Sequence, residues 1–429
     1  MTIQKTISPV DGSVYCEREL ATDAAIDTAL TQAREAQQRW RLTPVAERAR
    51  VCLSFCGNFE AETREIATEL TWQMGRPIRY APNEVRGTLE RARHMIAIAG
   101  DALADIDVGP KEGFQRFLRR EPLGVVFTIA AWNYPYLIAV NSVIPALMAG
   151  NAVLLKHSAQ TPLCAERFEN CLRAAGLPDG LFRVLQLSHE QTSRLIRDPR
   201  VDFVAFTGSV DGGRAVQRAA AERFIGVGLE LGGCDPAYVR EDADLPHAVE
   251  NLVDGAFFNS GQSCCGIQRI YVHRRVYEKF VAGAVELTRR YVLGNPTDPE
   301  TTLGPVVRTA AARQIRAQIA ASIAAGARAA IDEREFRASD AATPYLAPQI
   351  LLDVNHSMPV MREEIFGPVA GIMPVAGDDE AVRLMNDNPF GLTAAGWTAD
   401  EQAALAIGQR IETRTWFMNR GDYLDPALA

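Results

Sequence analysis

The sequence has little that would suit a nucleic-acid or membrane partner. Its 45 lysines and arginines against 53 acidic residues leave a net charge of −8, with no dense basic cluster. Nucleic acids and anionic membranes are bound through basic patches, so we expect neither as a partner. The first residues also lack the apolar stretch of a secretory signal, so we expect a cytoplasmic protein.

Metal-binding and disulfide patterns are lacking too. The eight cysteines show no repeated Cys-x-x-Cys spacing and no histidine partner at zinc-finger spacing. A disulfide framework is not expected in so long a chain. We therefore expect free thiols, no metal site and a reducing environment.

Charge is absent from residues 123–155. The stretch is long enough to cross a bilayer, for which about 20 apolar residues suffice. Three asparagines and two prolines interrupt it, however. Two buried strands flanking a buried helix fit it better.

The pattern of apolar residues predicts two α/β regions. The chain of 429 residues is too long for one small core. Its first hundred residues predict helices, one of them capped by Thr22. Strands are expected at 123–130, 152–156, 181–187, 201–206 and 224–231, with helices between them. This alternation predicts a parallel, doubly wound sheet, which binds ligands at the carboxyl ends of its strands.

Smaller signals refine this expectation. One helix should run to Met148, and Thr161 before Pro162 should cap the next, which Gly176 ends. Residues 109–122 are polar and predict a protruding hairpin. From Gly233 a second α/β region runs to the end of the chain.

Cys264 and Glu230 are the first candidates for chemistry. Cys264 lies in Gly261-Gln262-Ser263-Cys264-Cys265-Gly266, and Glu230 precedes Leu231-Gly232-Gly233. A thiolate is a strong nucleophile, and a carboxylate can activate the water that releases a captured acyl group. Taken singly, the cysteine could be a small buried hydrophobe and the glutamate a surface acid.

Three further segments could bind a cofactor or stabilise charge. Phe206-Thr207-Gly208-Ser209 joins a strand to a helix whose start favours phosphate, although it lacks the dinucleotide fingerprint and could be a structural turn. Lys156 ends a strand and could contact a sugar or phosphate, or merely extend to solvent. Asn133 could donate to an oxyanion or form an Asx turn.

Six segments then occur in one order: Trp132-Asn133-Tyr134-Pro135, Lys156, Phe206-Thr207-Gly208-Ser209, Glu230-Leu231-Gly232-Gly233, Gly261-Gln262-Ser263-Cys264 and Glu364-Ile365-Phe366-Gly367-Pro368. In this order they resemble the aldehyde dehydrogenase superfamily, from about Ile7 to Gly421. The resemblance implies a Rossmann-type NAD(P)-binding domain (1–108 and 123–232), a bridging, oligomerising hairpin (109–122) and an α/β catalytic domain (233–429).

The resemblance also implies roles for single residues. Cys264 matches the catalytic cysteine, Glu230 the general base, and Asn133 the oxyanion-hole amide that works with the Cys264 backbone N–H. The implied cofactor contacts are Lys156 at the adenosine ribose, Ser209 at the pyrophosphate, Glu364 and Phe366 at the nicotinamide ribose and ring, and Trp132, Ser158, Gly208, Gly213 and Leu231 beside them.

The implied reaction oxidises an aldehyde to a carboxylic acid with hydride transfer to NAD(P)+, through a thiohemiacetal and a thioester on Cys264. Members that pass the acyl group to coenzyme A generally lack the base, so Glu230 favours hydrolysis over that alternative. NAD-preferring members often carry an acid where this chain has Ala159. Because Lys156 or Ser158 could then bind a phosphate, we expect use of both NAD and NADP.

Two departures concern substrate and assembly. Ile138, Asn141 and Ser142, with Ser263 and Cys265 beside the nucleophile, offer no cation to a carboxylate. We therefore expect an uncharged aldehyde. Family members also usually continue for tens of residues past the last one here. The apparent lack of that tail leaves open a homodimer or homotetramer, or a catalytically impaired cofactor-binding homologue.

Overall fold

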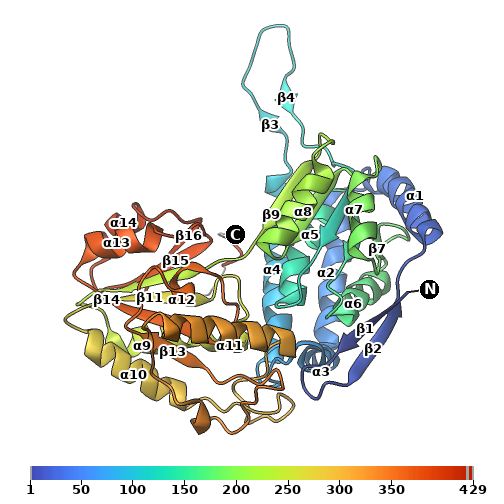
Figure 1. Cartoon of the computed structure of the whole chain (residues 1–429). Helices are drawn as coiled ribbons and strands as arrows, with labels where there is room; N and C mark the ends of the chain where they lie inside the picture. Colours follow the sequence, from blue (N-terminus) through green and yellow to red (C-terminus); the bar gives the residue numbers. More distant parts are fainter. Residues whose placement is uncertain (1, 422–424, 428–429) are drawn as a thin grey trace.

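Two α/β halves lie side by side in the computed structural model, which describes residues 2–421 and 425–427 (Figure 1). Each half is built on its own sheet. Residues 422–424, 428 and 429, at the end of the second predicted region, lie outside the described residues.

The sheet of the first half is wholly parallel, in the order β7-β6-β5-β8-β9. Its strands are β5 (Val125–Ile129), β6 (Ala152–Lys156), β7 (Phe182–Val184), β8 (Phe203–Thr207) and β9 (Gly226–Glu230). The order reverses between β5 and β8, which confirms the doubly wound expectation. Sheets of this kind bind ligands in a crevice at the carboxyl ends of the strands where the order reverses.

Helices cover both faces of this sheet (Figure 1). The helices of this half are α1 (Asp23–Trp40), α2 (Val45–Ala61), α3 (Thr63–Met74), α4 (Ala81–Ala102), α5 (Pro135–Met148), α6 (Pro162–Ala174), α7 (His189–Arg197) and α8 (Val210–Ala220). The uncharged stretch 123–155 forms β5, α5 and β6, as expected. No helix among the described residues is both long and apolar enough to span a membrane.

Two expectations for this half are wrong in detail. The first hundred residues are not all helical, because β1 (Ile3–Ile7) and β2 (Val14–Glu19) form an antiparallel hairpin. Gly12, at φ 78°, lies in the turn between them. Thr22 does cap α1, but Thr161 does not cap α6, because its hydroxyl lies 3.0 Å from the His157 ring instead.

The second half holds a mixed sheet in the order β12-β13-β14-β11-β10-β15-β16, in which only the β12–β13 pair is antiparallel. Its strands are β10 (Asp235–Val239), β11 (Ile267–His273), β12 (Arg328–Ala329), β13 (Gln349–Leu352), β14 (Val369–Val375), β15 (Thr393–Trp397) and β16 (Thr415–Met418). Its helices are α9 (Leu245–Phe257), α10 (Tyr277–Arg289), α11 (Thr309–Ala324), α12 (Pro359–Arg362), α13 (Asp378–Asn386) and α14 (Glu401–Gly408).

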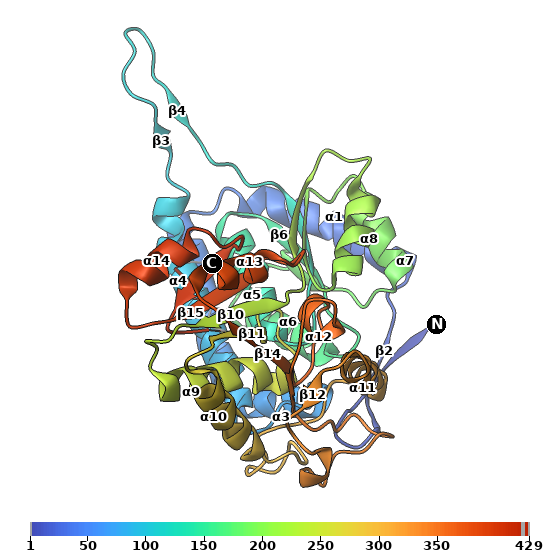
Figure 2. The ribbon, with the colours of Figure 1, turned by 60° about the vertical axis from the view of Figure 1, so that its left-hand side comes forward.

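A long hairpin projects from the first half, away from both sheets (Figure 2). Its paired segments are short, β3 (Ile106–Asp107) and β4 (Phe117–Leu118), so the pairing begins before the predicted range 109–122. Phe114, Phe117 and Leu118 are exposed on it.

Candidate active site

The strand order brings several candidate residues to one edge of the first sheet. Trp132 and Asn133 follow β5, and Gly208 and Ser209 follow its neighbour β8. Glu230 ends β9, which is next to β8. Because carboxyl ends of parallel strands meet at one edge, residues far apart in the sequence face one crevice.

The loop before Cys264 has an unusual backbone. Asn259, Ser260 and Gly261 follow one another in the left-handed region, at φ 53°, 57° and 69°. The first two have side chains, and such conformations cost about 1–3 kcal/mol each unless the surroundings hold them. Strain of this kind gathers at functional sites. Here it ends at Gly261, three residues before half-buried Cys264, and Ser263 between them is buried.

Asn133 contacts this loop directly. Its side chain is buried, and its Nδ2 donates to the carbonyl of Gln262 at 3.2 Å, across 129 positions of sequence. The predicted oxyanion donor and the predicted nucleophile are therefore brought together from different halves of the chain.

The turn that holds Glu364 and Phe366 packs against Gly233, just after β9. Glu364 Oε1 accepts a hydrogen bond from the Gly233 N–H at 3.1 Å. A Cβ on Gly233 would lie only 2.2 Å from the carbonyl oxygen of Cys264, so this position needs glycine. Burial raises the pKa of Glu364, an effect that the Gly233 N–H opposes.

An aromatic pair joins the segment after β5 to the turn that follows Glu364. The Phe366 and Trp132 rings meet edge to face, with centroids 5.6 Å apart. Phe366 is itself left-handed, at φ 54°, so its ring direction is set by a constrained backbone. The structure thus places these two predicted cofactor residues against each other.

Glu230 has a charged partner, Arg414. Its carboxylate is about half exposed and forms an ion pair with Arg414, which lies just before β16. Sequence analysis missed Arg414, because a single arginine between two predicted elements gives no signal. The arginine is bonded to Oε1 of this carboxylate.

The turn from β8 into α8 forms a tight cradle. A helix follows Ser209, as expected, and Ser209 caps it by accepting from the Gly212 N–H at 3.1 Å. A Cβ on Gly208 would lie 2.7 Å from the Phe206 ring, and one on Gly213 would lie 2.6 Å from Leu231 Cδ2. The missing side chains let strand and helix pack closely, which leaves backbone at the helix start for an anion.

Lys156 ends β6, and Ser158 and Ala159 follow it, at the same edge of the sheet but separated from the β8–α8 turn by β5. Lys156 is half-buried, burial lowers its pKa, and it has no ion-pair partner among the described residues. Ser158 accepts from the Gln160 N–H at 3.2 Å, and Ala159 is exposed. A half-buried cation without a counter-charge suits an anionic or polyhydroxyl ligand.

Three more residues at the site were missed by sequence analysis. Arg76 and Glu84 form a fully buried ion pair, and Arg76 also donates to the Asn133 carbonyl at 2.7 Å. Asn259 donates to the same carbonyl at 3.1 Å. Arg76 and Glu84 are eight positions apart in a region predicted to be helical. Nothing in that spacing indicates that the two charged side chains are buried together.

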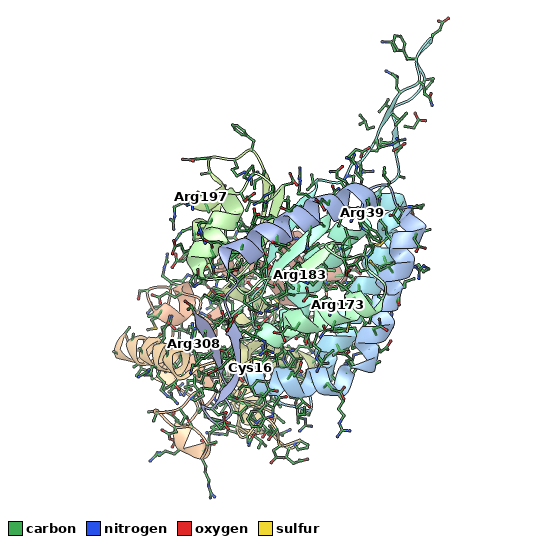
Figure 3. The ribbon with its side chains drawn as sticks, turned by 90° about the vertical axis from the view of Figure 1, so that its right-hand side faces the viewer. Cys16, Arg39, Arg173, Arg183, Arg197 and Arg308 are labelled. Carbon is green, nitrogen blue, oxygen red and sulfur yellow. The ribbon has the colours of Figure 1, made fainter. Side chains whose placement is uncertain are left out.

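A separate surface hollow of about 440 Å³ lies among α1, α6 and β7. Arg39, Arg173 and Arg183 lie around it (Figure 3). Glu169 approaches both Arg173 and Arg183 at 3.7 Å. None of the candidate site residues lines this hollow, and its charges are largely matched.

Comparison with known proteins agrees with this geometry. The model of the "Aldehyde dehydrogenase family" matches residues 2–428. The "Succinate-semialdehyde dehydrogenase [NADP(+)]" of Mycobacterium avium (strain 104) is 34% identical over 417 residues, which cover 96% of this chain and 88% of that protein.

Solved structures give the same result. Succinic semialdehyde dehydrogenase from Streptococcus pyogenes, in complex with NADP+, superposes with a TM-score of 0.93 at 27% identity, covering 98% of this chain and 92% of that one. An NAD-dependent aldehyde dehydrogenase from Sinorhizobium meliloti gives 0.93 at 31% identity, covering 99% and 85%. The chain therefore belongs to the aldehyde dehydrogenase family.

Proposed function

We propose that this chain oxidises an aldehyde to a carboxylic acid with Cys264 as nucleophile, Asn133 as oxyanion donor and Glu230 as general base. The contact between the Asn133 amide and the Gln262 carbonyl carries this proposal, because it fixes an amide donor beside the nucleophile loop. Bound NAD(P)+ supplies the hydride acceptor.

Each residue acts in a physically distinct way. The Cys264 thiolate attacks the aldehyde carbon, and the oxyanion is met by Asn133 Nδ2 and the Cys264 backbone N–H. One such donor is worth about 3–4 kcal/mol in related acyl-transfer sites. Collapse of the oxyanion breaks the aldehyde C–H bond, whose hydride NAD(P)+ would accept, and leaves a thioester on Cys264. Glu230, after its carboxylate has left Arg414, takes a proton from the water that attacks this thioester, and the Cys264 thiolate leaves.

The cofactor proposal is dual use of NAD and NADP. Lys156 without an ion-pair partner among the described residues, Ser158 beside it and the absence of an acid at Ala159 support a 2′-phosphate. The relatives named above include NADP- and NAD-dependent enzymes. The proposed contacts are Trp132, Lys156, Ser158, Gly208, Ser209, Gly213, Leu231, Glu364 and Phe366.

Two substrate classes remain as proposals. An uncharged aldehyde is favoured by α5, where Asn141 is exposed and the Ser142 hydroxyl already lies 2.7 Å from that of Thr128. Succinate semialdehyde is favoured by the names of the relatives. A panel containing both classes separates them by kcat/KM.

We also propose the division into an NAD(P)-binding domain (1–108 and 123–232), a bridging hairpin (109–122) and a catalytic domain (233–429). The exposed apolar side chains on the hairpin support its use in a homodimer or homotetramer. Sedimentation of the wild type beside a chain lacking the hairpin tests this role.

The activity test follows reduced nicotinamide absorbance in wild type, Cys264→Ala and Glu230→Gln. Cys264→Ala should abolish turnover. Glu230→Gln should keep one burst of hydride transfer per site and lose about 10²- to 10⁴-fold in steady-state rate, because only hydrolysis needs the base. A rate raised by coenzyme A would favour the acylating alternative. Folded wild type that binds NADP without turnover would favour the impaired homologue.

A further inference from the structure

Arg76 lies in a position to fix the peptide that carries the Asn133 amide. Its guanidinium is fully buried and donates through Nη2 to the Asn133 carbonyl at 2.7 Å and through Nε to Asn259 Oδ1 at 3.2 Å. It also lies 4.7 Å from the centroid of the Tyr134 ring. One planar guanidinium thus contacts both Asn133 and the loop that precedes Cys264.

Asn259 completes the link to the nucleophile loop. Its Nδ2 donates to the carbonyl of Asn133 at 3.1 Å and to the carbonyl of Gln262 at 3.2 Å. The Gln262 carbonyl therefore accepts from two amides, those of Asn259 and Asn133. These shared acceptors set the distance between the Asn133 side chain and the backbone that leads to Cys264.

Glu84 fixes the other side of Asn133. It pairs with Arg76 through one carboxylate oxygen, and through the other it accepts from the N–H groups of Tyr136 at 3.0 Å and Leu137 at 3.2 Å. α5 has no side-chain cap from its own N-terminal residue, so Glu84 supplies it. The carboxylate also complements the positive end of the helix.

We propose that Arg76, Glu84 and Asn259 are positioning residues that align the Asn133 amide with the Cys264 backbone N–H for the developing oxyanion. This inference rests on the proposed function, in which those two groups form the oxyanion site. A misplacement of about 1 Å in such a site can cost about 10²-fold in rate. The network should therefore act on acylation of the thiol and not on cofactor binding.

The decisive variant is Arg76→Lys, which keeps the charge opposite Glu84 but lacks the fork that reaches Asn133 and Asn259 together. Arg48→Lys is the matched control, because Arg48 is also buried and donates to the Met148 carbonyl at 2.9 Å, at the other end of α5. Each substitution removes a buried guanidinium that donates to a backbone carbonyl near one end of α5, Arg76 at the Asn133 carbonyl before the helix and Arg48 at its last residue, Met148.

Two reactions of Cys264 separate alignment from thiol reactivity. With p-nitrophenyl acetate the thiolate attacks the ester carbonyl, a C–S bond forms, the C–O bond to nitrophenolate breaks, and an oxyanion develops on the way. With iodoacetamide the thiolate displaces iodide and no oxyanion forms. Arg76→Lys should slow nitrophenolate release and the aldehyde-dependent hydride burst by about 10- to 100-fold. It should leave alkylation and the Kd for NADP close to those of Arg48→Lys.

Asn259→Asp is the second variant, in case Arg76→Lys does not fold. Aspartate tolerates the left-handed backbone but loses both amide donors, so the same selective loss is expected. Equal loss in acylation and alkylation, or equal acylation in the Arg76 and Arg48 variants, would overturn the inference.

The two proposals can fail separately. If wild type is acylated by the ester at Cys264 but oxidises no aldehyde, the proposed function is wrong and the variants still decide the inference. If Cys264→Ala changes neither reaction of wild type, both proposals are wrong.

Discussion

Gly261→Ala should damage stability and catalysis together. An added Cβ would lie 2.1 Å from the Gly367 carbonyl oxygen and 2.8 Å from the Pro368 nitrogen, and both are backbone atoms that cannot rotate away. Gly261 is also left-handed, at φ 69°. Overpacking and the left-handed backbone together should lower the free energy of unfolding by about 2–5 kcal/mol.

The catalytic effect follows from the position of the loop. Gly261 separates Asn259 from Gln262, so a shift that relieves the clash moves the carbonyl that accepts from Asn133. We expect the hydride burst to fall by about 10²-fold.

Urea titration by tryptophan fluorescence measures the first effect, since Trp397 is fully buried in the second half. Gly57→Ala is the control. Gly57 is an exposed residue inside α2 with open space at its Cβ, so alanine should stabilise by about 0.5–1 kcal/mol. If Gly261→Ala has the same unfolding midpoint and the same burst rate as wild type, Gly261 does not pack closely against Gly367.

Three other variants test single groups. Lys156→Ala should raise the KM for NADP by about 10- to 100-fold, as expected for losing a charge-assisted hydrogen bond, and kcat should change less. His157→Gln should flatten the pH dependence of stability. Burial lowers the pKa of His157 to about 4, so on acidification the unfolded chain binds a proton first. The difference in free energy of unfolding between wild type and His157→Gln should therefore shrink by about 3 kcal/mol as the pH falls from about 6.5 to about 4. Urea titrations across that pH range measure this difference. Arg414→Ala should raise steady-state turnover by no more than about 5-fold where hydrolysis limits the rate, because an exposed ion pair holds Glu230 by about 1 kcal/mol or less. If the hydride burst of Arg414→Ala is unchanged in the same absorbance measurements, the change in turnover arises after hydride transfer.

The sequence predicted the elements that depend on local patterns. The apolar runs marked β5 and β6, and the helix between them ends at Met148 as predicted. Thr22 caps α1 as predicted, because a side-chain oxygen three residues before an N–H is a local signal.

Non-local contacts could not be predicted in this way. Thr161 has the sequence of a cap, yet its hydroxyl lies against His157, which is itself held by the Pro135 carbonyl. Arg76 meets Asn259 across 183 positions. Such contacts depend on how the two halves pack against each other. Residue spacing and secondary-structure propensity within one segment do not specify that packing.

The hydrogen bonds around Asn133 have a consequence for biogenesis. The donors and acceptors come from α4, the start of α5, and the segments that follow α3, β5 and α9. A nascent chain that has completed the first sheet still lacks Asn259 and Gln262, so its Asn133 amide has neither neighbour. Contacts of such long sequence separation form late, because loop closure must precede them. The contacts that hold Asn133 against the loop before Cys264 can therefore form only after Gln262 has been made, when the second half begins to fold against the first.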